Sequence, residues 1–270
     1  MRVNNPFLFP VFTDQSGRNV IIDTPPRRII SLVPSQTELL HYFGLNEEVV
    51  GITKFCVHPQ AWFRTKTRVG GTKDIKHEII HSLQPGLIIA NKEENIREQV
   101  EELSKHYPVW VSDVNNLADA YEMVEQVGTI TAKKETAQKL VTEIKQAFSM
   151  LKNDSRRITA CYLIWQKPYM TVGGDTFINA MMEAAGFENV FKSSNRYPEI
   201  TLEDIRAKNQ AIILLSSEPF PFTNKHTEDL KTHFPGTAII TVNGELFSWY
   251  GSRMLHAPAY FLNLRQHGFH

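Results

Sequence analysis

Residues 116–151 read NLADAYEMVEQVGTITAKKETAQKLVTEIKQAFSML, and this stretch decides the fold. Asn116 stands where a helix N-cap is expected, and Asp119 occupies the acidic position of a capping box. Apolar residues follow at helical spacing, with Lys and Glu mostly between them: Leu117, Ala120, Tyr121, Val124, Val127, Ala137, Leu140, Val141, Ile144, Phe148 and Leu151. The pattern predicts one long helix. Its weak point is the β-branched run around Gly128, where it can kink.

A helix of this length would measure roughly 50 Å at about 1.5 Å per residue, which exceeds the width of a domain of about 110 residues. It must therefore contact two bodies. The sequence on either side of it shows the same alternation of short strands and helices. We expect a spine helix over residues 116–152 that joins an N-terminal lobe, residues 1–115, to a C-terminal lobe, residues 153–270.

Each half alternates apolar runs of strand length with short amphipathic segments. The expected strands cover residues 28–33, 49–53, 87–90, 109–111, 158–165, 211–216 and 238–242. The expected helices begin near Ser35, capped with Glu38, and cover residues 75–83, 94–106, 176–185, 202–207, 230–233 and 258–265. Residues 12–23 are expected to form a hairpin that turns at residues 14–17. The alternation predicts an α/β fold with mainly parallel sheets, whose ligands bind beyond the carboxyl ends of the strands.

Composition limits the classes of function. At 270 residues with 42% hydrophobic content, the chain is long enough for two lobes with sizeable cores. Lys+Arg and Asp+Glu are both 29, so no net field attracts nucleic acid or an anionic membrane, and we expect no nucleic-acid partner. Cys56 and Cys161 fall in different halves, and we expect both to be free thiols.

The N-terminal residues do not predict a targeting segment. MRVNNPFLFPVFTDQSG contains only a short apolar run broken by two prolines, which is not the pattern of a secretory signal. No stretch reaches the roughly 18 unbroken apolar residues of a membrane span. The sequence by itself fits a cytoplasmic protein as well as one from which a leader has been removed.

Four segments around the long helix resemble a known family. They are TDQSGRNVIIDTPPRRIISLVPSQTELL at residues 13–40, VGGTK at 69–73, LQPGLIIA at 83–90 and LFSWYGSR at 246–253. Their order and spacing resemble the cobalamin and ferric-siderophore substrate-binding proteins of ABC importers, the helical-backbone metal receptor group, with the cobalamin-binding branch most similar. Two features depart from that family: Gly86 stands where Asp is usual, and neither an export signal nor a lipoprotein cysteine is recognised.

The resemblance implies the fold, the ligand and the partners. It implies two α/β lobes joined by one helix, a metal chelate held in the cleft between them, and docking onto the membrane subunits of an ABC permease. It also implies a periplasmic or cell-envelope location. We expect the protein to act as a monomer without catalytic residues, a resident metal or a cofactor.

A corrin-like chelate is flat and largely apolar on its faces, so its site needs aromatic planes and a few hydrogen-bond donors. The aromatic residues expected to bind it follow the strands of the second half: Trp165, Tyr169, Phe220, Phe222, Phe247, Trp249 and Tyr250. Two or three such rings can contribute several kcal/mol, at about 25 cal/mol per Å² and about 150–250 Å² each. Micromolar affinity needs about 8 kcal/mol. Trp165 and Phe247 can equally close the core of the lobe.

The first half supplies matching loop positions, which are also ligand-binding candidates: Ser35, Gln36, Phe55, His58, Gly70 and Gly71. The glycines allow a close approach of the backbone to a neighbour. His58 can coordinate the metal of the chelate, although a loop His before Pro more often bonds to backbone. A haem or ferric-siderophore receptor would need basic residues, and Arg196 and Arg253 are the obvious ones.

The resemblance also places carboxylates that dock onto the permease. In the first lobe they are Glu94 and Glu98, although the directly matching position is Arg97. In the second lobe the matching position is Ser248, and Glu245 is the nearest acid. Surface glutamates are more often only solvated.

One motif favours a different class of protein. His77, Glu78 and His81 form H-E-x-x-H, which on a helix places two imidazoles on one face for zinc and the Glu as a base, with Glu101 as an imaginable third ligand. Helix geometry argues against it. The buried stripe should be Ile75, Ile79 and Leu83, so both histidines should face solvent. A zinc metallohydrolase is therefore the alternative from another class.

Other enzyme motifs do not occur in the sequence, which has no Walker loop, no G-x-G-x-x-G, no G-x-S-x-G and no C-x-x-C. Residues 173–175, Gly-Gly-Asp, can bind an anion at a helix start, but a turn with Asp175 as the helix cap is favoured. We therefore interpret the chain as a non-enzymatic receptor that presents a cobalamin-like chelate to a permease. A haem or ferric-siderophore receptor is the alternative within the class.

Overall fold

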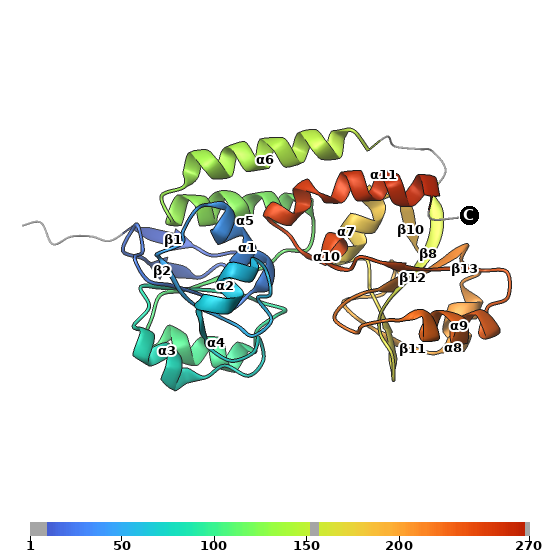
Figure 1. The fold of residues 1–270 in the computed structure, drawn as a ribbon, viewed down its shortest axis with the longest axis horizontal. Helices are drawn as coiled ribbons and strands as arrows, with labels where there is room; N and C mark the ends of the chain where they lie inside the picture. Colours follow the sequence, from blue (N-terminus) through green and yellow to red (C-terminus); the bar gives the residue numbers. More distant parts are fainter. Residues whose placement is uncertain (1–9, 152–156, 268–270) are drawn as a thin grey trace, which may run out of the picture. The chain divides into compact units, whose positions relative to one another are not determined.

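The computed structural model describes residues 10–151 and 157–267, which form two compact units (Figure 1). Unit 1 contains the described residues through Asp113, together with Tyr121–Thr142 and Tyr250–Ser252. Unit 2 contains Val114–Ala120, Glu143–Trp249 and the described residues from Arg253 onward. The chain therefore passes from one unit to the other several times.

Unit 1 is built on a five-stranded sheet in the order β5-β4-β3-β6-β7, in which every neighbouring pair is parallel. The strands are β3 (Ile29–Ser31), β4 (Val49–Ile52), β5 (Thr67–Arg68), β6 (Leu87–Asn91) and β7 (Val109–Ser112). The connecting helices are α1 (Pro34–Tyr42), α2 (Gln60–Thr65), α3 (His77–Leu83) and α4 (Arg97–Ser104). Every residue of β3, β6 and β7 is buried, as in a sheet covered on both faces. The parallel order brings the carboxyl ends of all five strands to one edge.

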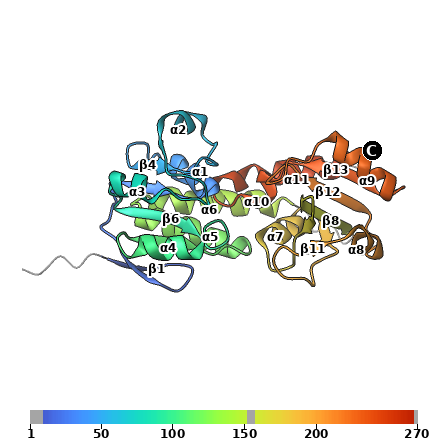
Figure 2. The ribbon, with the colours of Figure 1, turned by 90° about the horizontal axis from the view of Figure 1, so that it is seen from below.

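Unit 2 has a six-stranded sheet with the path β11-β9-β8-β12-β13, and β10 pairs with the first residues of β8. The strands are β8 (Ile158–Trp165), β9 (Tyr169–Thr171), β10 (Phe187–Asn189), β11 (Glu199–Ile200), β12 (Ile212–Ser216) and β13 (Ala238–Val242). Its helices are α7 (Phe177–Ala184), α8 (Leu202–Ala207), α9 (Asn224–His233), α10 (Glu245–Ser248) and α11 (Ala257–His267), with a 3₁₀ turn η1 (Ser252–Leu255) before α11. β9 pairs antiparallel with both β8 and β11, and the other described strand pairs of this sheet are parallel. The α/β class with mainly parallel sheets is confirmed (Figure 2).

Each unit has its own apolar core. In unit 1, strand residues pack with α3 and α4 through Ile30, Leu32, Ile80, Ile88, Val100, Leu103 and Val109. In unit 2, the core contains Cys161, Leu163, Phe191, Ile205, Ile213, Leu215, Leu230 and Phe234. Cys56 and Cys161 are both free and buried. Burial raises the pKa of Cys56, and it raises the pKa of Cys161 to about 12, so neither thiol is a ready nucleophile.

The prediction of one continuous helix over residues 116–152 is wrong. Two helices occupy this stretch, α5 (Leu117–Ile130) and α6 (Lys134–Ser149), and the chain reverses between them (Figure 1). The reversal falls directly after the β-branched run, where Ala132 has a positive φ of 56°. Residue 152 lies outside the described residues.

Gly128 explains why the two helices pack instead of forming one rod. A Cβ atom at this position would lie 2.3 Å from Cβ of Ala137, so only glycine allows α6 to approach α5 this closely. The backbone N–H of Lys133 donates to the carbonyl of Gly128 at 2.6 Å and closes the turn. Buried side chains on both helices, such as Val124 and Leu140, then take part in packing rather than facing water.

The predicted helix starts are correct in one case and wrong in another. Asn116 caps α5, because its Oδ1 accepts from the backbone N–H of Asp119 at 3.1 Å. Ser35, in contrast, does not cap α1: the helix begins at Pro34, and Ser35 is buried within its first turn. Proline suits the first helical position, because the N–H that it lacks would have no helical partner there.

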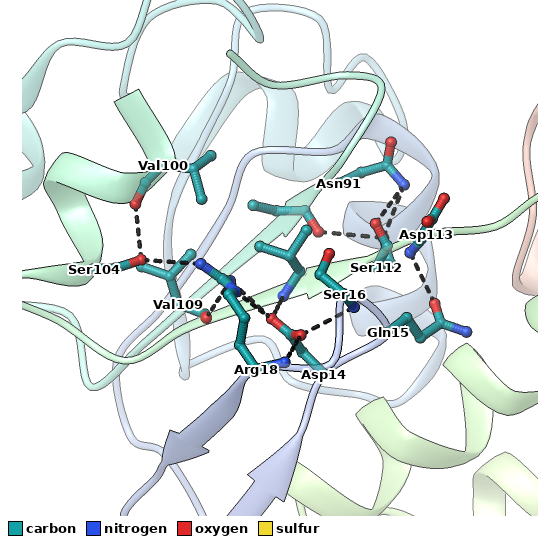
Figure 3. Close-up of polar contacts among 12 residues, drawn as sticks. Asp14, Gln15, Ser16, Arg18, Asn91, Val100, Ser104, Val109, Ser112 and Asp113 are labelled. Atoms are coloured by element: carbon teal, nitrogen blue, oxygen red, sulfur yellow. Dashed lines mark hydrogen bonds and ion pairs between the residues drawn. The ribbon is translucent and has the colours of Figure 1, made fainter. Parts of the chain in front are cut away.

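The predicted hairpin is confirmed as β1 (Val11–Thr13) paired antiparallel with β2 (Asn19–Ile21). Asp14 is buried at its turn, and its carboxylate accepts from the backbone N–H groups of Ser16 at 3.0 Å and of Arg18 at 2.9 Å (Figure 3). The same carboxylate accepts from Val111 N at 3.2 Å, which fastens the hairpin to β7. Within the described ranges, no helix combines the length and the apolar composition needed to cross a bilayer.

Candidate functional site

We call the loops that follow β3–β7 the unit 1 edge. It holds the first-half residues that the sequence singled out: Ser35, Gln36, Phe55, His58, Gly70 and Gly71. Phe55 is 50% exposed and His58 is partly exposed, whereas the other four residues are buried. Only the loop after β4 therefore presents these predicted side chains to solvent.

The glycines of this edge approach the chain's own backbone. Gly70 has a φ of +104°, and a Cβ atom there would lie 2.1 Å from the carbonyl oxygen of Asp74. Gly71 N donates to the same carbonyl at 2.7 Å, and a Cβ on Gly71 would lie 3.2 Å from the Phe55 ring. The sequence predicted that these glycines allow a close approach of the backbone to a neighbour, and here the neighbour is another part of the same loop. Their contact with a ligand stays a prediction.

Buried side-chain amides connect the loops of the unit 1 edge, and of these the sequence singled out Gln36 but not Asn91 or Asn95. Gln36 Nε2 donates to Ser112 Oγ at 2.5 Å. Asn91 Nδ2 donates to the same oxygen at 3.0 Å (Figure 3). Asn95 Nδ2 donates to the carbonyl of Thr72 at 2.9 Å. These bonds join the ends of β3, β5, β6 and β7. The available signal was the position of a polar residue directly after an apolar strand, as in LIIAN.

Tyr250 belongs to the same network, although it comes late in the chain. It lies in unit 1 and is only 7% exposed. Burial raises the pKa of Tyr250, while hydrogen bonding with Gln36, Ser112 and Ser35 opposes part of that rise. The phenol is therefore neutral near pH 7 and helps to hold the edge together.

We call the loops that follow β8, β12 and β13 the unit 2 edge. Here Trp165 is 39% exposed, and its ring meets that of Phe220 edge-to-face at 5.5 Å. Phe222 is buried and lies 4.8 Å from Phe220. Tyr169 packs on the core of unit 2, and its hydroxyl accepts from Gln166 Nε2 at 3.0 Å. Trp165 is thus the exposed ring among these four, Phe220 and Tyr169 are half-buried, and Phe222 is buried.

Phe247 is a core residue. It is fully buried, and its ring centre lies 5.3 Å from that of Tyr162 and 4.8 Å from that of Phe261. This is the core placement that the sequence left open beside ligand binding. The side chain is not accessible to a ligand in this structure, and we leave it out of the proposed site.

Arg253 is held by neighbours in unit 2. Its Nη1 lies 3.0 Å from Glu245 Oε2, and its guanidinium lies over the Trp249 ring, 5.0 Å from the ring centre. Both charged side chains are largely buried, at 15% and 21% exposure. The predicted docking residue Glu245 is therefore engaged in an ion pair rather than displayed.

Glu218 completes this cluster and was missed by the sequence analysis. Its Oε1 accepts from Ser248 Oγ at 2.5 Å, and the Trp249 side chain is a second donor. Burial raises the pKa of Glu218 and Glu245 adds to the rise, while the two donors and Arg253 partly oppose it. In the sequence, a single Glu after an apolar strand looks the same whether it becomes partly buried, as Glu218 does, or stays solvated at the surface.

The other predicted docking acids are displayed. Glu94 is exposed in the loop after β6, and Glu98 is exposed in the first turn of α4. The resemblance places Arg97 at the position of the family's docking carboxylate. Its Nε lies 2.6 Å from Oε1 of Glu101. Glu94 and Glu98 are therefore accessible to a partner, and their role stays a prediction.

The H-E-x-x-H histidines lie on α3 at the surface of unit 1. His81 is exposed, as expected, and its Nδ1 lies 2.8 Å from the Tyr107 hydroxyl, whereas His77 is half-buried. The buried residue of α3 is Ile80, while Ile79 and Leu83 of the expected stripe are half-buried. The imagined third ligand, Glu101, is paired with Arg97. In the part of the chain that the structure describes, no group of three or more His, Cys, Asp or Glu side chains is placed to hold a metal ion.

The Gly-Gly-Asp turn is structural. Thr176, not Asp175, caps α7, because its hydroxyl accepts from Asn179 N at 3.2 Å. Asp175 instead accepts from Arg196 N at 2.6 Å, and Arg196 Nη1 donates to the Asp175 carbonyl at 3.2 Å. A Cβ atom on Gly174 would lie 2.1 Å from the carbonyl oxygen of Lys192, so this turn packs against the backbone of the segment that follows β10. The cap prediction was wrong because threonine, one position later, serves as well.

Comparison with known proteins places this geometry in a wider group. The family model described as "Periplasmic binding protein" matches residues 29–241. A vitamin B12-binding protein of Vibrio campbellii is 28% identical over 211 residues, which cover 76% of this chain and 75% of the relative. An ABC transporter substrate-binding lipoprotein of Bacillus subtilis, YvrC, itself uncharacterised, is 26% identical over 220 residues, covering 77% of this chain and 69% of the relative.

Solved structures show the same fold. The periplasmic vitamin B12-binding protein BtuF of Vibrio cholerae superposes with a TM-score of 0.76 at 22% identity, covering 90% of this chain and 99% of that one. The periplasmic heme-binding protein HutB of Vibrio cholerae gives a TM-score of 0.76 at 19% identity, covering 88% and 98%. At these identities the likeness establishes the fold.

Proposed function

The chain belongs to the periplasmic binding protein family, and from this premise we propose that it is a receptor that binds a cobalamin-type metal chelate and delivers it to an ABC-type permease. The observation that carries the proposal is the exposed Trp165 ring, paired edge-to-face with the half-buried Phe220, at the carboxyl edge of the unit 2 sheet. Ligands of α/β sheets bind at such edges. Phe55 at the unit 1 edge is a further exposed ring of the same kind.

Flat rings suit a flat ligand for a simple energetic reason. Each ring that a ligand covers removes up to about 150–250 Å² of apolar surface from water, at about 25 cal/mol per Å². Because Trp165 is only 39% exposed and Phe220 is half-buried, covering the exposed parts of both rings can supply a few kcal/mol of the roughly 8 kcal/mol that micromolar binding needs. Polar groups of the ligand rim would then be met by the donors and acceptors beside the rings, which fix its orientation.

Similarity to named relatives supports the cobalamin type over other chelates. The relative from Vibrio campbellii carries the name vitamin B12-binding protein and matches three quarters of both chains, whereas the heme-binding structure shares the fold at lower identity. Delivery to a permease is supported by the substrate-binding role named for the Bacillus subtilis relative. The exposed Glu94 and Glu98 are the side chains that we propose for docking onto it.

A fluorescence titration tests the proposal. The purified full chain is titrated with cyanocobalamin, haemin and a ferric siderophore while tryptophan emission is recorded. We expect cyanocobalamin to quench saturably at micromolar concentration or below, and the quenched signal to be smaller in Trp165→Phe. Absence of saturable quenching and of calorimetric binding for all three chelates would refute the receptor assignment.

A further inference from the structure

The charged groups of the unit 2 edge are arranged so that its guanidinium is neutralised. Arg253 lies 3.0 Å from Glu245, and the Glu218 carboxyl is close enough to both for their charges to act on it in opposite directions. One cation thus faces two carboxyl groups. The cluster has a net charge of zero or minus one, depending on whether Glu218 holds its proton, and it is positive in neither state.

The remaining basic residue expected to serve an anionic chelate is engaged as well. Arg196 Nη1 donates to Asn115 Oδ1 at 2.9 Å and lies 3.8 Å from the Asp175 carboxylate. Haem propionates and siderophore catecholates carry negative charge, and binding them at such a site would either break these pairs or place like charges side by side. An anionic ligand rim would therefore have to compete with carboxylates for both of these arginines.

Glu218 is also positioned to accept hydrogen bonds. A carboxylate has about four acceptor positions, and Ser248 and Trp249 are its two side-chain donors within unit 2. Gly244 leaves the room for this arrangement, because a Cβ atom there would lie 2.7 Å from Glu218 Cγ. Its remaining acceptor capacity suits the N–H groups of carboxamide side chains, which surround a corrin ring and carry no charge.

We propose that Glu218, together with Glu245, determines the ligand class of the site: it selects a metal chelate that is neutral or cationic and carries N–H donors on its rim, and it rejects chelates with anionic rims. This inference rests on the proposed function, since it concerns the same ligand. Arg253 then acts as a structural cation that holds the two carboxylates in place instead of as a receptor for carboxylate groups.

The test compares two chelates of opposite rim chemistry on matched variants of the full chain. Cyanocobalamin, with neutral amides, and haemin, with two propionates, are titrated calorimetrically into wild type, Glu218→Gln, Glu245→Gln and the double variant. Glu228→Gln, an exposed acid on α9 that pairs with Lys231 at 2.9 Å, is the control for loss of one negative charge. Circular dichroism confirms that each variant is folded.

We expect wild type and the control to prefer cyanocobalamin. In the double variant, loss of charged acceptors weakens cyanocobalamin binding about tenfold, and release of Arg253 strengthens haemin binding about tenfold. If wild type binds cyanocobalamin and the variants keep its ratio of affinities, the inference is overturned and the receptor assignment stands. If wild type prefers haemin, the inference is likewise overturned. If wild type binds neither chelate nor a ferric siderophore, the proposed function itself fails.

Discussion

The carboxyl edges of the two sheets are built from different chemistry. The unit 1 edge is tied together by buried amides and hydroxyls such as Gln36, Asn95 and Ser112, although Phe55 in the loop after β4 is 50% exposed. The unit 2 edge presents an exposed ring, Trp165, and a partly exposed ion pair, Arg253 with Glu245.

This difference separates two tasks. A network of hydrogen bonds between buried polar groups fixes the course of the backbone, and its loss leaves further donors and acceptors without partners inside the protein. Exposed rings and a half-buried carboxyl contribute little to folding but offer surfaces and acceptors to a ligand. Substitutions at the unit 1 edge should therefore reduce stability, and substitutions at the unit 2 edge should change binding.

The largest effect on stability is expected at Gly70. Gly70→Ala combines a left-handed backbone conformation with a collision against the Asp74 carbonyl, and it should lower the free energy of unfolding by about 3 kcal/mol. Urea denaturation measures it. Gly17→Ala is the control, since Gly17 also has a positive φ but no atom within 4 Å of the place that a Cβ would occupy, and it should lose only about 1 kcal/mol. Equal losses would mean that the Asp74 contact does not shape the edge.

A smaller loss is expected at Asn95. Asn95→Ala removes the donor to the Thr72 carbonyl and the acceptor for Asn91 N, so it should cost about 2 kcal/mol of stability. Asn263→Ala, on the exposed surface of α11, should stay within about 0.5 kcal/mol of wild type. Chemical denaturation measures the free energy of unfolding of both variants. Comparable losses in the two variants would contradict the structural role that we assign to the network.

The unit 2 edge should show the opposite profile. Trp165→Ala should weaken cyanocobalamin binding about tenfold while the unfolding free energy changes by less than about 1 kcal/mol, because the ring is 39% exposed. Phe63→Ala, an exposed ring on α2 that lies under Arg68, should leave the affinity unchanged. Calorimetric titration measures the affinity of each variant for cyanocobalamin. An unaltered affinity in Trp165→Ala would show that this ring does not contact the ligand.

The smallest effect is a gain in stability at Glu218. Because burial raises its pKa, the folded protein binds this proton more strongly than the unfolded chain does, and stability falls as pH rises from about 4.3 through the raised value. Glu218→Gln removes this cost, so the thermal midpoint should rise by about 2 °C at pH 7 and change little at pH 4. Calorimetric scans at both values measure it. If the thermal midpoint of Glu218→Gln at pH 7 is lower than that of wild type, Glu218 stabilises the fold, which would contradict its assignment as a recognition residue.

Strong periodicity made much of the fold predictable from the sequence. The strand at residues 158–165, the helix at 202–207 and the strand at 238–242 were predicted with the limits that the structure has. Short elements such as α2, α10 and β11 were missed, because two to six residues contain less than two helical turns or too few alternations to show a period. The turn before α6 was missed because the apolar spacing resumes directly after it.

The site was less predictable, and the reason is physical. Trp165 and Phe247 both follow buried strands, yet one ring is exposed and the other is fully enclosed by Tyr162 and Phe261. Sequence position alone does not reveal whether a ring that follows a strand is exposed or buried. Glu218 and Asn95 acquire their roles from residues distant in the sequence, which no local pattern encodes.

Equilibrium dialysis of the full chain against cyanocobalamin tests the central claim most directly. We expect one ligand per chain at saturation, a Kd in the micromolar range or below, and weaker competition from haemin than from a second corrinoid with neutral amides. Retention no greater than that of an unrelated protein of equal size, or a preference for haemin, would contradict the central claim.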